Sequence, residues 1–153
     1  MNKLEVFFQQ LIQHLGFLPD EVELKINETE DLILVDINVP ESDSGIMIGT
    51  GGEVLVSIQR LARVIFYDQF DKKIQVNINQ YRQTRQLKLE DLAHRVADEV
   101  NETNKGRMIR KQLSSYERFI IHNYIAEQYP DLESVSRGEG EDRHIFIKPK
   151  AQV

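Results

Sequence analysis

The chain has 153 residues, of which 41% are hydrophobic and 29% charged, and its formal net charge is -6 at pH 7. This balance is typical of one ordinary globular domain or of two very small ones, and it argues against a disordered chain. The absence of cysteine excludes disulfides, thiolate metal sites and a thiol nucleophile. No segment approaches the roughly 20 apolar residues of a membrane-spanning helix, and the N-terminus lacks a signal-peptide core, so we expect a soluble, cytoplasmic protein without membrane insertion.

The first half of the chain predicts an α+β unit with a three-stranded sheet. Apolar residues spaced by three and four indicate helices, and apolar residues that alternate with polar ones indicate strands. In chain order these patterns predict a helix, two strands, a glycine-rich turn, a second helix and a third strand, at residues 3–15, 22–26, 32–39, 49–52, 52–69 and 74–78.

The second half predicts two helices followed by two strands. A long helix with apolar residues at Leu89, Ala93, Val96 and Val100 fades where Asn, Thr and Gly accumulate, at residues 101–106. Ser114 and Glu117 have the spacing of a capping box, which places the next helix at about 115–129, before Pro130. The two strands are expected at 132–136 and 143–148.

Gly49, Thr50, Gly51 and Gly52 form a Gly-x-x-Gly turn that opens the second helix of the first half. Glycines let a ligand approach the backbone closely, and the N–H groups at the start of a helix favour an anion such as phosphate. Ile46, Met47 and Ile48, just before the turn, would line an apolar groove for bases. The alternative is a simple tight turn that caps a helix.

Arg118 and His122 are four residues apart on the helix predicted at 115–129, so they share one face. Arg can clamp a phosphate or stack on a base, and His can donate a hydrogen bond or stack. The neighbouring apolar residues, Phe119 among them, would mostly turn toward the core. The alternative is that Arg118 pairs with Glu117 or Glu139 and that His122 is a partly buried helix histidine.

The charge of the chain is unevenly distributed. Residues 1–80 carry 6 basic and 13 acidic residues, whereas residues 81–153 carry 13 basic and 12 acidic ones. Between residues 103 and 118, five basic residues face only one acidic residue, Glu117; they are Lys105, Arg107, Arg110, Lys111 and Arg118. Charge alone favours an ordinary solvated face for this basic stripe, and the alternative is a phosphate-binding surface.

Patterns of catalytic residues are absent from the sequence. The four histidines lack the His-Glu-x-x-His spacing of a zinc hydrolase, and the glycine-rich turn lacks the Lys of a nucleotide-binding loop. The acidic stretch at 138–142 lacks the spacing of a calcium-binding EF-hand. We therefore expect no enzymatic activity, no metal, no cofactor and no small-molecule substrate.

Three motifs together resemble a known family. They are the segment 43–55 around the glycine-rich turn, the segment 116–122 with Arg118 and His122, and Ser136-Arg137-Gly138-Glu139 followed by Arg143. In this order they resemble the bacterial Jag (SpoIIIJ-associated) family, in which a KH domain precedes an R-three-H domain, named for an Arg and a His separated by three residues. The resemblance implies a type II KH domain, with helices on one face of its sheet, at residues 1–80 and a small α/β R-three-H domain at residues 81–153, without the N-terminal Jag domain.

The resemblance also implies a ligand and the residues that bind it. The ligand would be single-stranded RNA, with single-stranded DNA as the alternative strand and another KH protein as a further partner. The turn would hold phosphates, Ile46 and Ile48 would face bases, and Arg118, His122 and Arg143 would form a second contact surface. With the basic stripe, the predicted nucleic-acid-binding residues are Ile46, Ile48, Gly49, Thr50, Gly51, Gly52, Lys105, Arg107, Arg110, Lys111, Arg118, His122 and Arg143.

One departure from the family pattern divides the expected roles. Family members place a basic residue between the two glycines, whereas Thr50 and Gly51 are neutral. We therefore expect the first half to supply geometry and the second half to supply most of the electrostatic attraction. The competing hypothesis is a protein-interaction scaffold, which binds a KH partner or a ribosomal component and whose KH half binds RNA weakly or no longer.

Overall fold

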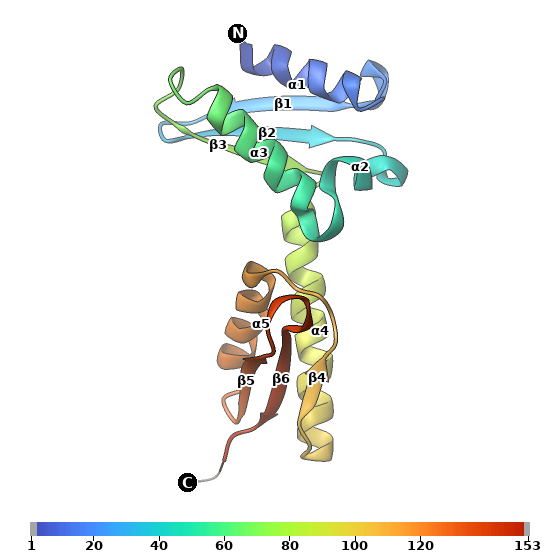
Figure 1. Ribbon diagram of the computed structural model, residues 1–153, viewed down its shortest axis with the longest axis vertical. Helices are drawn as coiled ribbons and strands as arrows, with labels where there is room; N and C mark the ends of the chain where they lie inside the picture. Colours follow the sequence, from blue (N-terminus) through green and yellow to red (C-terminus); the bar gives the residue numbers. More distant parts are fainter. Residues whose placement is uncertain (1–2, 152–153) are drawn as a thin grey trace. The chain divides into compact units, whose positions relative to one another are not determined.

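The structure is a computed structural model that describes residues 3–151. The chain divides into two compact units, residues 1–82 and 83–153. The first unit contains three complete α-helices and one three-stranded sheet among its described residues (Figure 1). Its elements are α1 (Lys3–His14), β1 (Glu23–Glu28), β2 (Leu32–Asn38), α2 (Ser44–Ile48), α3 (Glu53–Ile65) and β3 (Lys73–Ile78).

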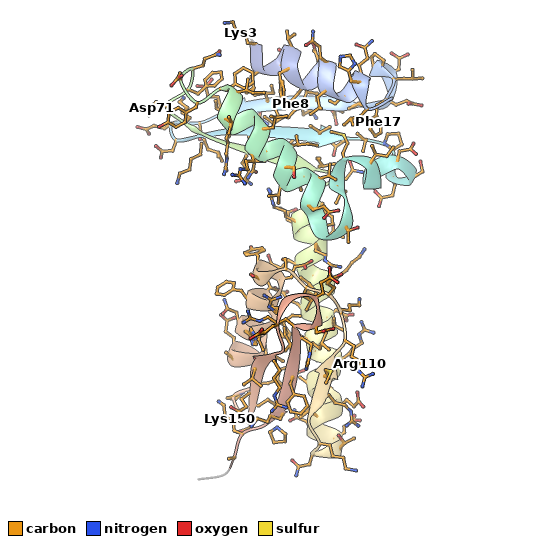
Figure 2. The ribbon with its side chains drawn as sticks, in the orientation of Figure 1. Lys3, Phe8, Phe17, Asp71, Arg110 and Lys150 are labelled. Atoms are coloured by element: carbon orange, nitrogen blue, oxygen red, sulfur yellow. The ribbon has the colours of Figure 1, made fainter. Side chains whose placement is uncertain are left out.

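The sheet of the first unit has the order β1-β2-β3, with β1 antiparallel to β2 and β2 parallel to β3. The parallel pair is possible because α3 connects β2 to β3 as a crossover. Every second residue of β2 and β3 is buried, and the buried residues of one strand are paired with those of the other. These side chains therefore lie on one face of the sheet, which is covered. Apolar residues of α1 and α3 pack on that face, and Figure 2 shows Phe8 on the side of α1 toward the sheet.

Two details of the first unit differ from the sequence-based expectation. The short segment before the glycines forms a helix of its own, α2, although it has only five residues. On α3, Leu61 and Ile65 belong to the apolar pattern that predicts the helix, but they are 48% and 46% exposed. The side of α3 that faces the sheet presents Leu55, Ile58 and Ala62 instead.

The second unit is built on a long helix and a second three-stranded sheet (Figure 1). The long helix α4 begins with two residues of the first unit and continues through the second. The elements are α4 (Tyr81–Thr103), β4 (Arg107–Ile109), α5 (Ser115–Gln128), β5 (Leu132–Arg137) and β6 (His144–Pro149).

The sheet of the second unit has the order β4-β6-β5 and is antiparallel throughout. Ile145 and Ile147 of the central strand are fully buried against a cluster from α4 and α5. Strand β4 was not anticipated from the sequence. It has only three residues, with one buried side chain, Ile109, so it shows too little alternation to be recognised within the basic stripe.

The predicted α+β class is confirmed, and so is the capping box at the start of α5. The backbone N–H of Glu117 donates to Ser114 Oγ at 3.2 Å, and the N–H of Ser114 donates to Glu117 Oε2 at 2.8 Å. This reciprocal pair satisfies two N–H groups at the helix N-terminus. It also fixes where α5 begins, and therefore which face carries Arg118 and His122.

Candidate nucleic-acid interface

The glycine-rich turn lies between α2 and α3 and depends on its glycines. Gly49, Gly51 and Gly52 have φ values of 72°, 60° and 85°, a region that other residues rarely adopt. A Cβ atom at Gly49 would lie 2.5 Å from Val54 Cγ2, and one at Gly52 would lie 2.8 Å from Tyr81 Cε1. Backbone conformation and close packing therefore both require glycine here.

Part of the hydrogen-bonding capacity of the turn is used within the protein. The N–H of Gly49 donates to Gly45 O at 2.9 Å, and the N–H of Gly52 donates to Gly49 O at 3.3 Å. Thr50 and Gly51, at the tip of the turn, are exposed. The tip precedes the 13-residue helix α3, whose N-terminus carries partial positive charge.

The two isoleucines before the turn have different environments. Ile46 is 50% exposed, whereas Ile48 is 8% exposed and packs in the core of the first unit. The expectation that both face bases therefore does not fit this structure, and only Ile46 remains available. The two lie on different sides of the short helix α2, whose formation the sequence did not reveal.

In the second unit, the guanidinium of Arg118 is held by neutral groups. It donates to the backbone O of Leu113 at 2.5 Å and to Ser115 Oγ at 3.1 Å. The alternative that Arg118 pairs with Glu117 is wrong, because Glu117 is buried and accepts from Arg85 Nε at 2.7 Å. The charge of Arg118 is therefore positioned without being neutralised by Glu117.

His122 is half-buried, with each ring nitrogen next to a serine hydroxyl of β5. Its Nδ1 lies 2.7 Å from Ser134 Oγ, and its Nε2 lies 2.9 Å from Ser136 Oγ. Burial lowers the pKa of His122, and the positive charges of Arg118 and Arg143 lower it further. The ring is therefore neutral near pH 7 and has two cations close to it.

The serines that hold His122 were not predicted as site residues. Ser134 and Ser136 are two residues apart on a strand, so their side chains point to the same face. That alternation was the available signal in the sequence. It could not be connected to His122, because the packing of α5 on β5 is set by the tertiary fold.

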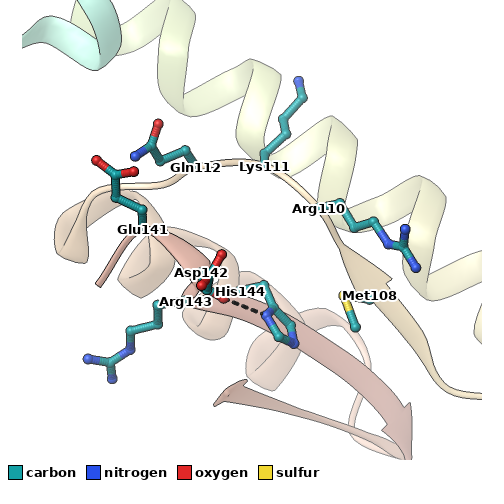
Figure 3. A pocket seen from close by; sticks show the side chains of 8 residues that line it. All are labelled: Met108, Arg110, Lys111, Gln112, Glu141, Asp142, Arg143 and His144. Carbon is teal, nitrogen blue, oxygen red and sulfur yellow. Dashed lines mark hydrogen bonds between the residues drawn. The ribbon is translucent and has the colours of Figure 1, made fainter. Parts of the chain in front are cut away.

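Three residues of the predicted set meet at a hollow of about 220 Å³ on the second unit (Figure 3). Arg110 and Lys111 follow β4, and Arg143 precedes β6. Figure 3 shows their charged ends extending outward in different directions, while His144 Nδ1 contacts Asp142 O at 2.8 Å. The hollow is lined by Met108, Arg110, Lys111, Gln112, Glu141, Asp142, Arg143 and His144.

The basic stripe from Lys105 to Arg118 is not one continuous surface. Arg107 forms an ion pair with Glu99 at 2.5 Å, so part of its charge is neutralised within the protein. Lys105 is exposed in the turn before β4. Of the basic residues predicted there, only Arg110 and Lys111 line the hollow with Arg143, while Arg118 lies near His122 on α5.

Phe119 also differs from the expectation that it would turn toward the core. It is 56% exposed, and its ring stacks beside that of Tyr116, with centroids 6.4 Å apart. Ile121 and Ile125 face the core instead.

Within residues 3–151, no group of three metal-ligating side chains occurs. The helices described there also include none that is long and apolar enough to cross a membrane.

Comparisons with known proteins agree with this arrangement of two units. A KH domain model matches residues 5–86, and an R-three-H domain model matches residues 87–149. The chain is thus built from a KH domain followed by an R-three-H domain.

Relatives of known name identify the family. The chain is 31% identical over 155 residues to RNA-binding protein KhpB of Clostridium symbiosum, an alignment that covers 99% of this chain and 67% of the relative. It is 30% identical over 119 residues to RNA-binding protein KhpB of Bacillus subtilis (strain 168), covering 76% of this chain and 57% of the relative. The chain belongs to the Jag family, which includes these KhpB proteins.

A more distant relative is RNA-binding protein KhpB of Streptococcus pneumoniae serotype 2 (strain D39). It is 25% identical over 129 residues, which are 83% of this chain and 39% of the relative. The chain therefore spans between about two fifths and two thirds of the length of these relatives.

Proposed function

We propose that this protein binds RNA without catalysing a reaction, and that its ligand is a single strand contacted by both units. The KhpB relatives are named as RNA-binding proteins, and the chain has both of the domains that define the family. The observation that carries the proposal is the cluster of Arg118, His122 and Arg143. The positive charges of Arg118 and Arg143 lower the pKa of His122, and the guanidinium of Arg118 is held by neutral partners.

In the second unit, the two arginines would contact consecutive phosphates. Arg donates bidentate hydrogen bonds that match phosphate oxygens. Because Leu113 O and Ser115 Oγ already orient the guanidinium of Arg118, little side-chain entropy remains to be lost on binding. The hollow beside Arg143 adds Arg110 and Lys111 along the path of the strand.

In the first unit, the exposed tip of the turn would contact the backbone of the strand. The N–H groups of Thr50 and Gly51 would face a phosphate, since those of Gly49 and Gly52 donate within the protein. Ile46 would contact a base. KH domains clamp about four nucleotides by their backbone at such a turn.

The test is a titration of fluorescent single-stranded RNA of mixed sequence at several salt concentrations. Affinity should fall with salt, with a log-log slope of roughly -0.7 for each phosphate contacted. Single-stranded DNA and duplex RNA of equal length should compete less well. Absence of binding at low salt would overturn the proposal.

Two single variants and a matched control locate the surface in the second unit. Arg118→Ala and Arg143→Ala should each weaken binding and make the slope shallower by roughly 0.7. Arg95→Ala removes the same charge from an exposed ion pair with Asp91 on α4 and should leave binding unchanged. If all three variants behave alike, Arg118 and Arg143 do not define the surface.

A further variant tests the first unit. Thr50→Asp/Gly51→Asp places two carboxylates where a phosphate is expected, and it should remove the contacts of the turn by repulsion. Binding equal to that of the parent protein would mean that the strand does not reach the turn.

A specific observation favours a second candidate function, protein interaction through α3. The outer face of α3 and the segment that follows the helix expose five apolar side chains, Val56, Leu61, Val64, Ile65 and Tyr67, with exposures of 55%, 48%, 68%, 46% and 80%. Apolar side chains gathered on one side of a helix are typical of an interface. Sedimentation should then show self-association, or association with another KH protein, that Val64→Asp abolishes.

A further inference from the structure

The sheet of the second unit has two different faces. Ile145 and Ile147 of β6 point to the face covered by α4 and α5. Phe146, between them, points to the opposite face, and its partners in register are Met108 on β4 and Val135 on β5. Directly opposed residues of an antiparallel sheet share a face, so these three side chains form a row across it.

Phe146 on this face is held in a defined position. The guanidinium carbon of Arg137 lies 4.2 Å from the centroid of its ring. A Cβ atom at Gly106 would collide with Phe146 Cζ, so the backbone at Gly106 approaches the ring as glycine allows. The edge of the ring is thus next to the backbone of Gly106, and its face is covered by Arg137, which is itself exposed.

Charged and polar side chains surround the Arg137–Phe146 stack. His144 is the partner of Arg137 in register, and Arg110 lines the same hollow as His144, which also contains Glu141 and Asp142 (Figure 3). Lys148 lies on the same face and pairs with Glu133 at 2.8 Å. Through the hollow, this face is continuous with Arg143, which belongs to the surface proposed above.

We propose that the Arg137–Phe146 stack is a base-binding platform for single-stranded RNA, with Arg110 contacting an adjacent phosphate. An unpaired base stacks on the plane of a guanidinium as it does on an aromatic ring. The exposed side of Arg137 offers such a plane, already oriented by Phe146. The inference rests on the proposed function and adds a site for bases to a surface so far defined by phosphate contacts.

An unpaired base is favoured over an apolar protein segment because a cation covers the aromatic ring. An apolar segment would have to desolvate the guanidinium of Arg137, which costs free energy unless the segment supplies a partner. A base stacked on Arg137 leaves the edges of the guanidinium free to donate to a phosphate or to water.

The experiment measures the affinity of the full protein chain for two single-stranded RNAs of equal length. One RNA carries bases and the other has abasic sugars. Arg137→Lys keeps the charge but removes the planar group, and Phe146→Leu keeps an apolar side chain but removes the ring. Both should weaken binding of the base-bearing strand roughly 5-fold or more, with an unchanged salt slope. Neither should weaken binding of the abasic strand.

The matched control is Phe119→Leu, which removes an exposed ring from α5 and should leave both affinities unchanged. If Phe146→Leu fails to fold, Arg137→Lys carries the test, because Arg137 is exposed. The inference is overturned if Arg137→Lys binds the base-bearing strand as the parent does, if both strands lose affinity equally, or if Phe119→Leu causes the loss instead.

These outcomes separate the inference from the proposed function. If the platform variants bind normally while Arg118→Ala weakens binding, the surface around His122 stands and the platform does not. If the parent protein binds neither strand at low salt, the proposed function and the platform both fail.

Discussion

The proposed sites in the two units differ in the groups that they present to an anionic ligand. The glycine-rich turn of the first unit presents backbone, and its flanks carry Asp43 and Glu53 without a nearby basic residue in sequence. The second unit presents Arg118 and Arg143 around His122, with Arg110 and Lys111 next to Arg143. In the proposed binding mode, shape and charge, which a phosphate-binding site usually combines, are divided between two units of one chain.

The difference teaches how each unit secures its site. In the turn, three glycines at positive φ and two close approaches fix the backbone, so the geometry is inseparable from residue type. Around His122, the side chains are fixed by hydrogen bonds to Leu113, Ser115, Ser134 and Ser136. The first site should therefore be sensitive to any added atom, and the second to loss of charge.

The largest effect is expected from Gly49→Ala. The new Cβ would meet Val54 Cγ2 at 2.5 Å and the Val54 backbone N at 3.0 Å, at a φ of 72°. Strain and overpacking together should destabilise the first unit by roughly 3 kcal/mol. Native-state hydrogen exchange of amides in β2 and β3 measures this loss, and amides in β6 should be unaffected.

The control for Gly49→Ala is Gly140→Ala in the second unit. Gly140 also has a positive φ, 56°, but nothing lies within 4 Å of a Cβ placed there. Its cost should be only the conformational one, roughly 1 kcal/mol. An equal loss of stability in Gly49→Ala and Gly140→Ala would show that close packing around Gly49 adds nothing to the cost of the backbone conformation.

A smaller effect, a gain in RNA affinity, is expected from Thr50→Lys. It adds the positive charge that the exposed tip of the turn lacks, next to the proposed phosphate position. One additional contact should tighten RNA binding roughly 5-fold and steepen the log-log salt slope by roughly 0.7. Thr50→Gln, of similar length and neutral, is the control. An unchanged slope for Thr50→Lys would place the strand away from the turn.

Local patterns in the sequence were sufficient for most of the fold. The capping box of Ser114 and Glu117 located α5, and alternation located β2 and β6, because these signals depend on neighbouring residues. Strand β4 was missed because its pairing with β6 lies about 40 residues away in sequence and only Ile109 is buried.

The site was only partly predictable, because local patterns do not show which residues from distant elements meet. The spacing of Arg118 and His122 placed them on one face of α5, but no local signal showed that Glu117 pairs with Arg85. Nor could spacing show that Ile48 is buried while Ile46 is exposed, since α2 is too short to display a period. Which side chains meet across elements was decided by packing.

The smallest expected effect concerns the protonation of His122. Burial lowers its pKa, and the charges of Arg118 and then Arg143 lower it further. Arg118→Ala should raise this pKa, and Arg95→Ala should not; the NMR chemical shift of the imidazole Cε1–H against pH measures both. Bound phosphate should also raise the pKa of His122, because negative charge stabilises the imidazolium.

The complex of protein and RNA then holds more protons than the free protein, so RNA affinity should increase as the pH falls below 7. His122→Gln should remove that dependence, and a dependence that persists in this variant would assign it to another group.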